Sequence, residues 1–182
     1  LDYLVTDPES GMLVSGPSSS PENSFLLPGG VVANSGMGNT MDQMIIHDVF
    51  ANLIEEADAI CAAAPNDAVK NDTVVASVRK AITKLKPPKI AADGRIMEWA
   101  DPWQENEPGH RHMSHLFGVH PSHQITIEET PELIAAARKS LDFRLANGGG
   151  HTGWSRAWLV NMFARLKDAE QAWHHVQMLL AK

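Results

Sequence analysis

Five stretches of helical periodicity constrain the fold of this chain more than any other feature of its sequence. In each stretch apolar residues recur at intervals of three or four, so they line one face of a helix. Turn signals separate the stretches, and short connections between some of them favour antiparallel helix pairs. The helices are expected, in chain order, over residues 39–64, 74–85, 131–146, 155–166 and 168–182. The sequence therefore predicts an all-α fold, and paired helices of this kind suit a helical toroid.

The apolar stripes also predict which helix faces are buried. The first helix carries its stripe at Ile45, Val49, Leu53, Ala57 and Ile60. The last helix carries its stripe at Ala169, Ala172, Trp173, Val176 and Leu180. Because apolar side chains on one face of a helix are normally covered by a neighbour, we expect both stripes to face the core.

Composition narrows the class of protein and of partner. A chain of 182 residues with 43% hydrophobic and 20% charged residues matches one globular domain with a continuous core. The formal net charge of -7 and the lack of a Lys/Arg cluster argue against a nucleic-acid partner. No apolar run is long enough for a transmembrane helix, so no membrane partner is expected. A neutral, hydroxyl-rich small ligand remains open.

Two long irregular segments contain the candidate site residues. The first forty residues are rich in turn-forming residues and allow short strands near residues 1–5 and near Phe25. Between residues 90 and 128 the helical periodicity is lost. A connection of that length in a compact domain usually carries function. We therefore look for the site in these two segments.

Five of the nine histidines lie within fourteen residues, from His110 to His123. Three interpretations are open. His110, His112 and His115 could converge on a metal ion, although Arg111 between them would repel a cation. The histidines could instead brace a long loop as hydrogen-bonded side chains. In the third interpretation Arg111 donates from a fixed fork and neutral His112 both donates and accepts, which suits sugar hydroxyls, and we favour it for these two residues.

Glu22 is the second candidate. It lies in the run Pro17-Ser18-Ser19-Ser20-Pro21-Glu22-Asn23, where two prolines restrict the backbone and could fix the direction of the carboxyl group. A carboxyl group fixed in this way can act as a general acid when its surroundings raise its pKa. The alternative is an ordinary solvated loop glutamate.

Two further motifs combine turns, acids and tryptophans. Residues 147–156 form a glycine-rich turn followed by Trp154, which is either a core side chain or a platform for a sugar ring. Residues 98–103 begin with Glu98 and Trp99 and pair acids with tryptophans. That mixture is found in sugar clefts and equally in ordinary loop packing, so both interpretations stay open.

Taken together, these motifs resemble glycoside hydrolase family 95, whose best-known members are 1,2-α-L-fucosidases. The similar runs are, in order, residues 17–23, Thr-Met-Asp-Gln at 40–43, Glu98-Trp99, residues 110–116 and Thr-Gly-Trp-Ser at 152–155. They cover nearly the whole chain in the order found in the family. Each run alone is modest evidence, but the joint pattern is highly specific.

The resemblance implies a fold and an activity. Members of the family have an (α/α)6 barrel catalytic domain flanked by β domains, so residues 1–182 are expected to be a fragment of one such domain, truncated at both ends. Members hydrolyse terminal α-linked L-fucose with inversion and without a metal or cofactor, and some prefer L-galactose. The implied partners are a fucosylated glycan and the flanking domains of a longer enzyme. Secreted or periplasmic localisation is expected for substrates of this kind.

The resemblance also implies roles for individual residues. Glu22 matches the proposed general acid, which protonates the leaving oxygen. Arg111 and His112 match the pair that hydrogen-bonds the fucose. The residues expected to support these three are Asp42, His115 and Trp154.

One part of the family's machinery has no counterpart in this sequence. The family activates water with an asparagine pair upstream of the acid and an aspartate in a later Asp-Gly-Asn motif, and neither occurs here. An inverting enzyme needs its acid and base roughly 6.5 to 9.5 Å apart, with water between them. We therefore predict that these residues alone are not a working hydrolase. The alternatives are a non-catalytic carbohydrate-binding helical module, an α-L-galactosidase of the same family and a histidine-based metallohydrolase.

Overall fold

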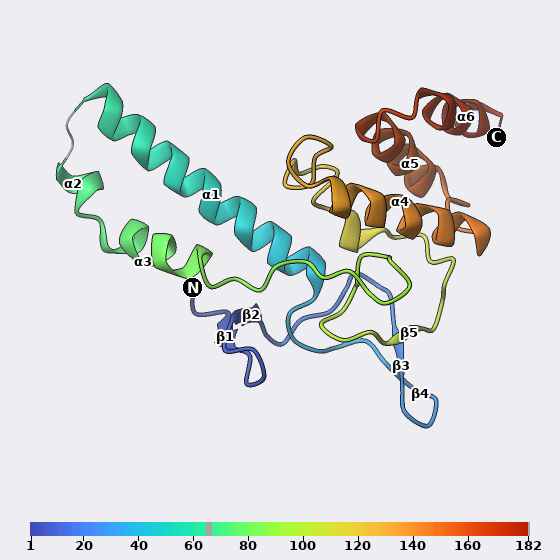
Figure 1. Ribbon diagram of the computed structural model, residues 1–182, viewed down its shortest axis with the longest axis horizontal. Helices are drawn as coiled ribbons and strands as arrows, with labels where there is room; N and C mark the ends of the chain where they lie inside the picture. The colour runs from blue at the N-terminus through green and yellow to red at the C-terminus, as the bar shows by residue number, and fades with distance from the viewer. Residues whose placement is uncertain (65–66, 182) are drawn as a thin grey trace.

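The computed structural model describes residues 1–64 and 67–181, which form a helix-rich structure with two small sheets (Figure 1). The helices are α1 (Thr40–Ala63), α2 (Asp67–Lys70), α3 (Thr73–Ile82), α4 (Pro131–Ala146), α5 (Gly153–Arg165) and α6 (Ala169–Leu180), with a 3-10 turn at Ser114–Leu116. The five predicted helices are confirmed in order, and α2 is an addition. Lys182, to which the last predicted helix extends, lies outside the described residues. None of the described helices is long and apolar enough to cross a membrane.

The strands correct the all-α prediction. β1 (Leu4–Thr6) and β2 (Leu13–Ser15) form an antiparallel hairpin. β3 (Phe25–Leu27) pairs with β4 (Val31–Ala33) on one side and with β5 (Gln104–Glu105) on the other. Backbone N–H and C=O groups need partners wherever a loop is covered, so the two irregular segments pair with each other where they pack together. The described helices also do not close into an (α/α)6 barrel, which requires six helix pairs, whereas six single α-helices are present in this part of the chain.

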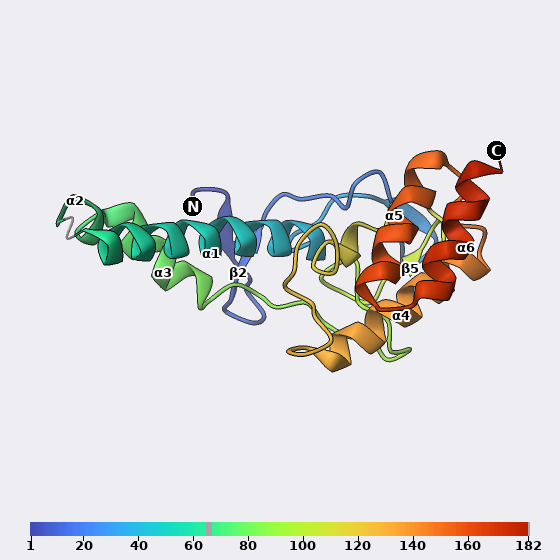
Figure 2. The same ribbon diagram turned by 90° about the horizontal axis from the view of Figure 1, so that it is seen from above.

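Two hydrophobic clusters divide the molecule, and α1 contributes to both. The larger cluster packs Met44, near the start of α1, against the histidine segment, α4 and α5. The smaller cluster packs Phe50 of α1 against α3 and the β1–β2 hairpin. We call residues 1–15, 46–64 and 67–88 the arm, and residues 16–45 and 89–181 the body. Figures 1 and 2 show the arm extending to one side of the body, with α4, α5 and α6 gathered at the opposite end.

The predicted stripe of α1 is largely wrong. Of its five residues only Ala57 is buried, and Val49 is 58% exposed. The large apolar side chain buried in the arm portion is instead Phe50, which lies outside the predicted stripe and packs with residues of α3. The helix contacts α3 and the 3-10 turn, so the neighbours that are present decide which face is covered.

The stripe of α6 is wrong in the same way. Trp173 is 60% exposed, whereas His175 is buried. The ring of His175 stacks on Phe163 of α5 with centroids 5.2 Å apart, and its Nδ1 lies 2.8 Å from an Arg156 guanidinium nitrogen. Burial, followed by the Arg156 and His174 charges, lowers the pKa of His175 to about 4. Since α6 packs against α5, Ala172 and Val176 are half-buried, whereas Ala169, Trp173 and Leu180 of the same stripe stay exposed.

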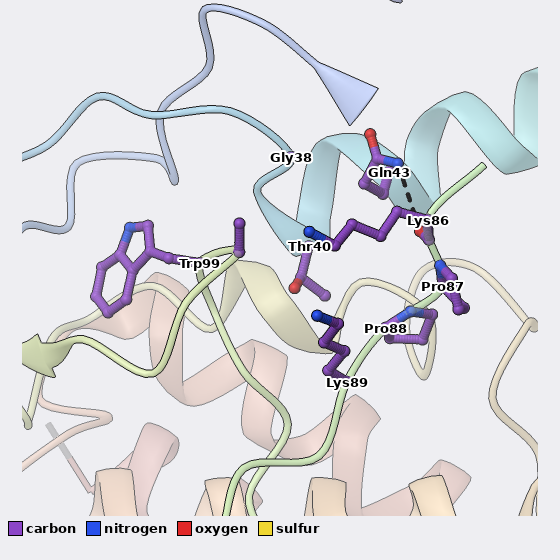
Figure 3. A pocket seen from close by; sticks show the side chains of 9 residues that line it. Gly38, Thr40, Gln43, Lys86, Pro87, Pro88, Lys89 and Trp99 are labelled. Atoms are coloured by element: carbon purple, nitrogen blue, oxygen red, sulfur yellow. Dashed lines mark hydrogen bonds between the residues drawn. The ribbon is translucent and has the colours of Figure 1, made fainter. Parts of the chain in front are cut away.

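Residues of the Thr-Met-Asp-Gln run fix the start of α1 to the neighbouring loops (Figure 3). Thr40 Oγ1 donates to the Met97 carbonyl at 2.6 Å. Gln43 accepts from the Ser15 N–H at 2.9 Å and donates to the Lys86 carbonyl at 3.4 Å, the bond dashed in Figure 3. One turn of helix thus connects the hairpin, the end of the arm and the segment that leads into the site.

Candidate active site

Glu22 is an exposed residue in a loop, and the residues on either side of it in that loop are buried. Its φ of 53° is in the left-handed region, which residues other than glycine rarely adopt. Its side chain is 64% exposed. Ser20 and Asn23, on either side, are each 1% exposed. The loop is therefore fixed on both sides of the acid while the acid faces solvent, beside a cavity of about 340 Å³ that Ser24 and Val32 also line.

The structure brings Glu22 together with Arg111 and His112, which come some ninety residues later in the chain. The Arg111 guanidinium donates a hydrogen bond to Glu22 Oε2. His112 Nε2 lies 3.9 Å from the same oxygen. Both partners are partly accessible, with side chains 38% and 18% exposed. An acid, a cation and an imidazole thus face one point on the surface.

His112 is a neutral imidazole between two aromatic rings. Burial, with contributions from Arg111 and His110, lowers the pKa of His112 below its ordinary value. At neutral pH one ring nitrogen can therefore donate and the other can accept. The rings of Trp154 and His110 flank it, with centroids 4.6 and 5.2 Å away. Trp154 is half exposed, so an apolar ring lies next to polar groups, a combination that suits the two kinds of surface on a sugar.

A close backbone contact places Trp154 beside the histidine segment. Gly109 packs so tightly against the Asn147 carbonyl that a Cβ at position 109 would collide with the oxygen. The chain then turns into α5, where the Thr152 side chain caps the helix by accepting the Ser155 N–H at 3.1 Å. The glycine-rich run is therefore a packing element that fixes the first turn of α5, and with it Trp154, against the site.

A buried carboxylate lies beneath these residues, that of Glu98, which the sequence placed in a motif with two open interpretations. The Glu98 side chain is 3% exposed and accepts hydrogen bonds from Ser20 Oγ at 2.6 Å and from Asn23 Nδ2 at 3.0 Å. Arg144 donates to Glu98 Oε2 at 2.5 Å. Burial raises the pKa of Glu98, while the Arg144 cation and the Ser20 hydroxyl oppose that rise. Since Ser20 and Asn23 flank Glu22, Glu98 binds the acid's loop from below.

Arg144 of α4 extends this network to the histidine segment. Its side chain is 1% exposed. One guanidinium nitrogen donates to the Pro108 carbonyl at 3.0 Å and the Glu107 carbonyl at 3.3 Å, and it also pairs with Glu105. A planar guanidinium with five donors can contact several acceptors at once. One buried arginine thus joins two carboxylates and the backbone that precedes Arg111.

The other histidines of the segment serve different parts of the structure. His115 is buried with its Nδ1 3.5 Å from Glu98 Oε2, and burial together with the nearby arginines lowers its pKa well below the ordinary value. His120 packs its ring edge-on against Trp158 of α5 at 5.4 Å. His123 lines a separate groove beside α1. Among the described residues, no group of three His, Cys, Asp or Glu side chains has the arrangement of a metal site.

Asp42 lies at the start of α1 and contacts Tyr3. The Tyr3 hydroxyl is 3.5 Å from Asp42 Oδ2 and donates to the Pro17 carbonyl at 2.6 Å. Asp42 is therefore linked through a tyrosine to the beginning of the loop that carries Glu22. This is an indirect contact with the acid's loop.

The two buried residues that the sequence analysis did not assign carry signals that could have found them. Arg144 follows the fully buried Leu141 by three residues and Ala137 by seven, so helical spacing places a charge on the apolar face of the third predicted helix. A buried arginine requires a partner of opposite charge. Glu98 has a weaker signal, an acid beside a tryptophan, which did not distinguish a site from loop packing.

An acid fixed in a loop thus lies beside a guanidinium, a neutral imidazole and an exposed tryptophan, and such a combination of hydrogen-bonding groups with an apolar ring can contact a sugar. The model of the glycosyl hydrolase family 95 catalytic domain matches residues 1–182, and the chain belongs to this family. Alpha-L-fucosidase 2 of Arabidopsis thaliana is 39% identical to it over 97% of this chain and 20% of that protein. Probable alpha-fucosidase A of Aspergillus oryzae is 26% identical over 94% of this chain and 23% of its own length, and the Aspergillus niger protein of that name is 24% identical over 99% and 22%. The chain spans about one fifth of the length of these relatives.

Proposed function

We propose that this chain forms the acid-bearing part of the catalytic domain of an inverting α-L-fucosidase, which removes terminal α-1,2-linked L-fucose from glycans. Glu22 is the general acid, and Arg111 and His112 bind the sugar. The observation that carries the proposal is the convergence of these three side chains from distant segments. Membership of the family and the names of the relatives support the same class of substrate.

In this proposal Glu22 transfers its proton to the glycosidic oxygen as the bond between that oxygen and the anomeric carbon breaks. The rest of the glycan then leaves as a neutral alcohol. The carboxylate paired with Arg111 corresponds to the state after this transfer. An incoming fucose offers hydroxyl oxygens to Arg111, and Glu22 then loses its partner and can take up a proton again. Neutral His112 contributes one donor and one acceptor to the same sugar.

The other half of an inverting reaction requires a base that takes a proton from the attacking water. We assign this base to residues outside the chain, since the family's water-activating motifs do not occur in this sequence. A chain that spans about one fifth of its relatives leaves ample length for those residues. We therefore propose that residues 1–182 are part of one (α/α)6 catalytic domain and do not hydrolyse fucosides in isolation.

Trp154 supplies an apolar surface beside the bound sugar in this proposal. L-Fucose carries a methyl group where L-galactose carries a hydroxymethyl group, so an apolar contact there favours fucose. Rates on matched α-1,2-linked L-fucosyl and L-galactosyl substrates distinguish the two sugars. A preference for the L-galactosyl substrate would assign the chain to an α-L-galactosidase instead.

The decisive experiment replaces the acid in the full-length protein. We expect Glu22→Gln to lower kcat on 2′-fucosyllactose by about 10³-fold, within the usual range for loss of a general acid, while fucose still binds in calorimetry. Glu9→Gln, at an exposed loop glutamate of the arm, is the matched control and should retain the wild-type rate. Unchanged turnover of Glu22→Gln would overturn the proposal. A full-length protein that binds fucose but never hydrolyses a fucoside would be a carbohydrate-binding module.

A further inference from the structure

We propose that Glu98 and Arg144 form a positioning pair, which fixes the loop carrying Glu22 relative to the segment carrying Arg111 and His112. The inference rests on the proposed function, because it takes Glu22 to be the acid. Neither member of the pair needs to touch the substrate. Their role is to hold Glu22, Arg111 and His112 in position relative to one another.

Glu98 contacts the acid's loop on both sides of Glu22. Its Oε1 accepts from Ser20 at 2.6 Å, and its Oε2 accepts from Asn23 at 3.0 Å. The Asn23 N–H also donates to the Ser20 carbonyl at 3.1 Å, which closes a turn around the acid. A left-handed conformation is unfavourable for a glutamate, so it persists where neighbouring contacts impose it. The two Glu98 bonds are contacts of that kind.

Arg144 carries the link across to the sugar-binding segment. It donates to Glu98 at 2.5 Å and to the Pro108 carbonyl at 3.0 Å, directly before the tight backbone contact at Gly109. Two buried side chains therefore connect the loop of Glu22 to the backbone of the segment with Arg111. Because water is excluded there, the polar bonds are strong and geometrically restrictive. A catalytic acid must be placed to within about 0.5 Å of its productive geometry, and this connection is short enough to do so.

The chemistry of the pair favours a positioning role over simple stabilisation. A buried ion pair contributes little more to folding than apolar side chains of equal size. The body already has a large apolar cluster around Leu116, Leu141 and Leu159. The charges lie where the two loops of the site come together, and the Glu98 carboxylate accepts hydrogen bonds there from three residues, Ser20, Asn23 and Arg144.

The arm contains a matched ion pair outside the site. Lys86 donates to Asp7 at 2.8 Å, and both side chains are 11% exposed. Asp7 also accepts from the Ser10 hydroxyl at 2.5 Å, as Glu98 does from Ser20. Asp7→Asn therefore removes a carboxylate with similar partners from a place that the proposed site does not use.

The test compares two substrates that differ in their need for an acid. The sugar alcohol that leaves 2′-fucosyllactose needs a proton, whereas the fluoride of α-L-fucosyl fluoride departs as a stable anion with little help. Misplacing Glu22 should slow the first substrate much more than the second. Loss of folded protein would slow both equally.

In the full-length protein we expect Glu98→Gln to lower kcat on 2′-fucosyllactose by about 100-fold and on the fluoride by less than about fivefold. Asp7→Asn should leave the ratio of the two rates at the wild-type value. Ser20→Ala, a smaller change at the same contact, should shift the ratio in the same direction by about tenfold and keeps the test open if Glu98→Gln does not fold. Equal losses on both substrates, or wild-type rates, for both Glu98→Gln and Ser20→Ala would overturn the inference.

Glu22→Gln, assayed on the same two substrates, separates this inference from the proposed function. If Glu22→Gln loses activity on 2′-fucosyllactose selectively and the Glu98 and Ser20 variants do not, only the positioning role is wrong. If Glu22→Gln loses no activity on either substrate, the proposed function fails and the positioning role fails with it.

Discussion

The arm and the body bury different kinds of side chain, although α1 runs through both. The arm packs mainly apolar residues around Phe50 and Val78, and its outer surface leaves Val49 exposed. The body buries Glu98 and Arg144 next to its apolar cluster, directly beneath the candidate site. Apolar contacts tolerate small displacements, whereas hydrogen-bonded charges fix both distance and direction. The arm also covers one ion pair, Asp7 with Lys86, but that pair joins only the hairpin loop to the segment after α3, whereas Glu98 and Arg144 join the two loops of the candidate site.

The largest expected effect comes from breaking the buried pair of the body. Arg144→Met leaves Glu98 and Glu105 without their shared cation, and removing one partner of a buried pair costs about 3 to 5 kcal/mol. We expect faster amide exchange in α4 and in residues 104–112 of the full-length protein, measured by hydrogen–deuterium exchange. Arg138→Met on the same helix removes an arginine that is 41% exposed. It should change the free energy of opening, obtained from the exchange rates, by less than about 1 kcal/mol. Equal effects of the two variants would contradict the contrast.

The next effect tests whether the arm opens separately. Phe50→Ala removes the largest side chain of the smaller cluster, and such truncations cost about 3 kcal/mol or more. We expect exchange to accelerate in α3 while α4 and α5 keep their protection. Acceleration of all three helices by the same factor would show that arm and body open as one unit.

A smaller effect concerns pH and lies within the body. The pKa of His175 is lowered to about 4 in the folded chain, from 6.5 in the unfolded one. The stability that this difference contributes is therefore complete above about pH 6.5 and is lost as the pH falls towards 4. A glutamine at position 175 stays neutral at all pH values. Between pH 7 and pH 5 the melting temperature of His175→Gln should therefore fall by about 2 °C less than that of the wild type, measured by differential scanning calorimetry. An identical fall in wild type and variant would contradict this assignment.

The smallest effect is expected on the exposed face of the arm. Val49 is 58% exposed, and Val49→Ser should change stability by less than about 0.5 kcal/mol. Exchange in α1 is the measurement, with Phe50→Ala as the reference one residue away. A large loss from Val49→Ser would mean that another surface covers this face in the full-length protein.

The sequence by itself determined the five longer helices and identified Glu22, Arg111 and His112 as candidate site residues. Helical period is a local property, and Asp168, at the predicted start of the last helix, caps α6 with its side chain. The motif around Glu22 and the Arg111-His112 pair were likewise identifiable, since their composition departs from that of ordinary loops. Local sequence patterns, however, do not predict that these two segments come into contact.

Only the tertiary structure decided which faces are buried and how the loops are joined. The stripes of α1 and α6 failed because burial depends on which neighbours pack against a helix, and periodicity contains no information about them. Two of the strands, β1 and β3, lie where the sequence allowed them, but their partners were not predicted, because strand pairing joins residues as distant as Phe25 and Glu105. The links from Ser20 and Asn23 through Glu98 to Arg144 span far greater separations than any local rule covers. Their formation depends on the path of both long loops, and so on the balance of burial and hydrogen bonding over the whole fold.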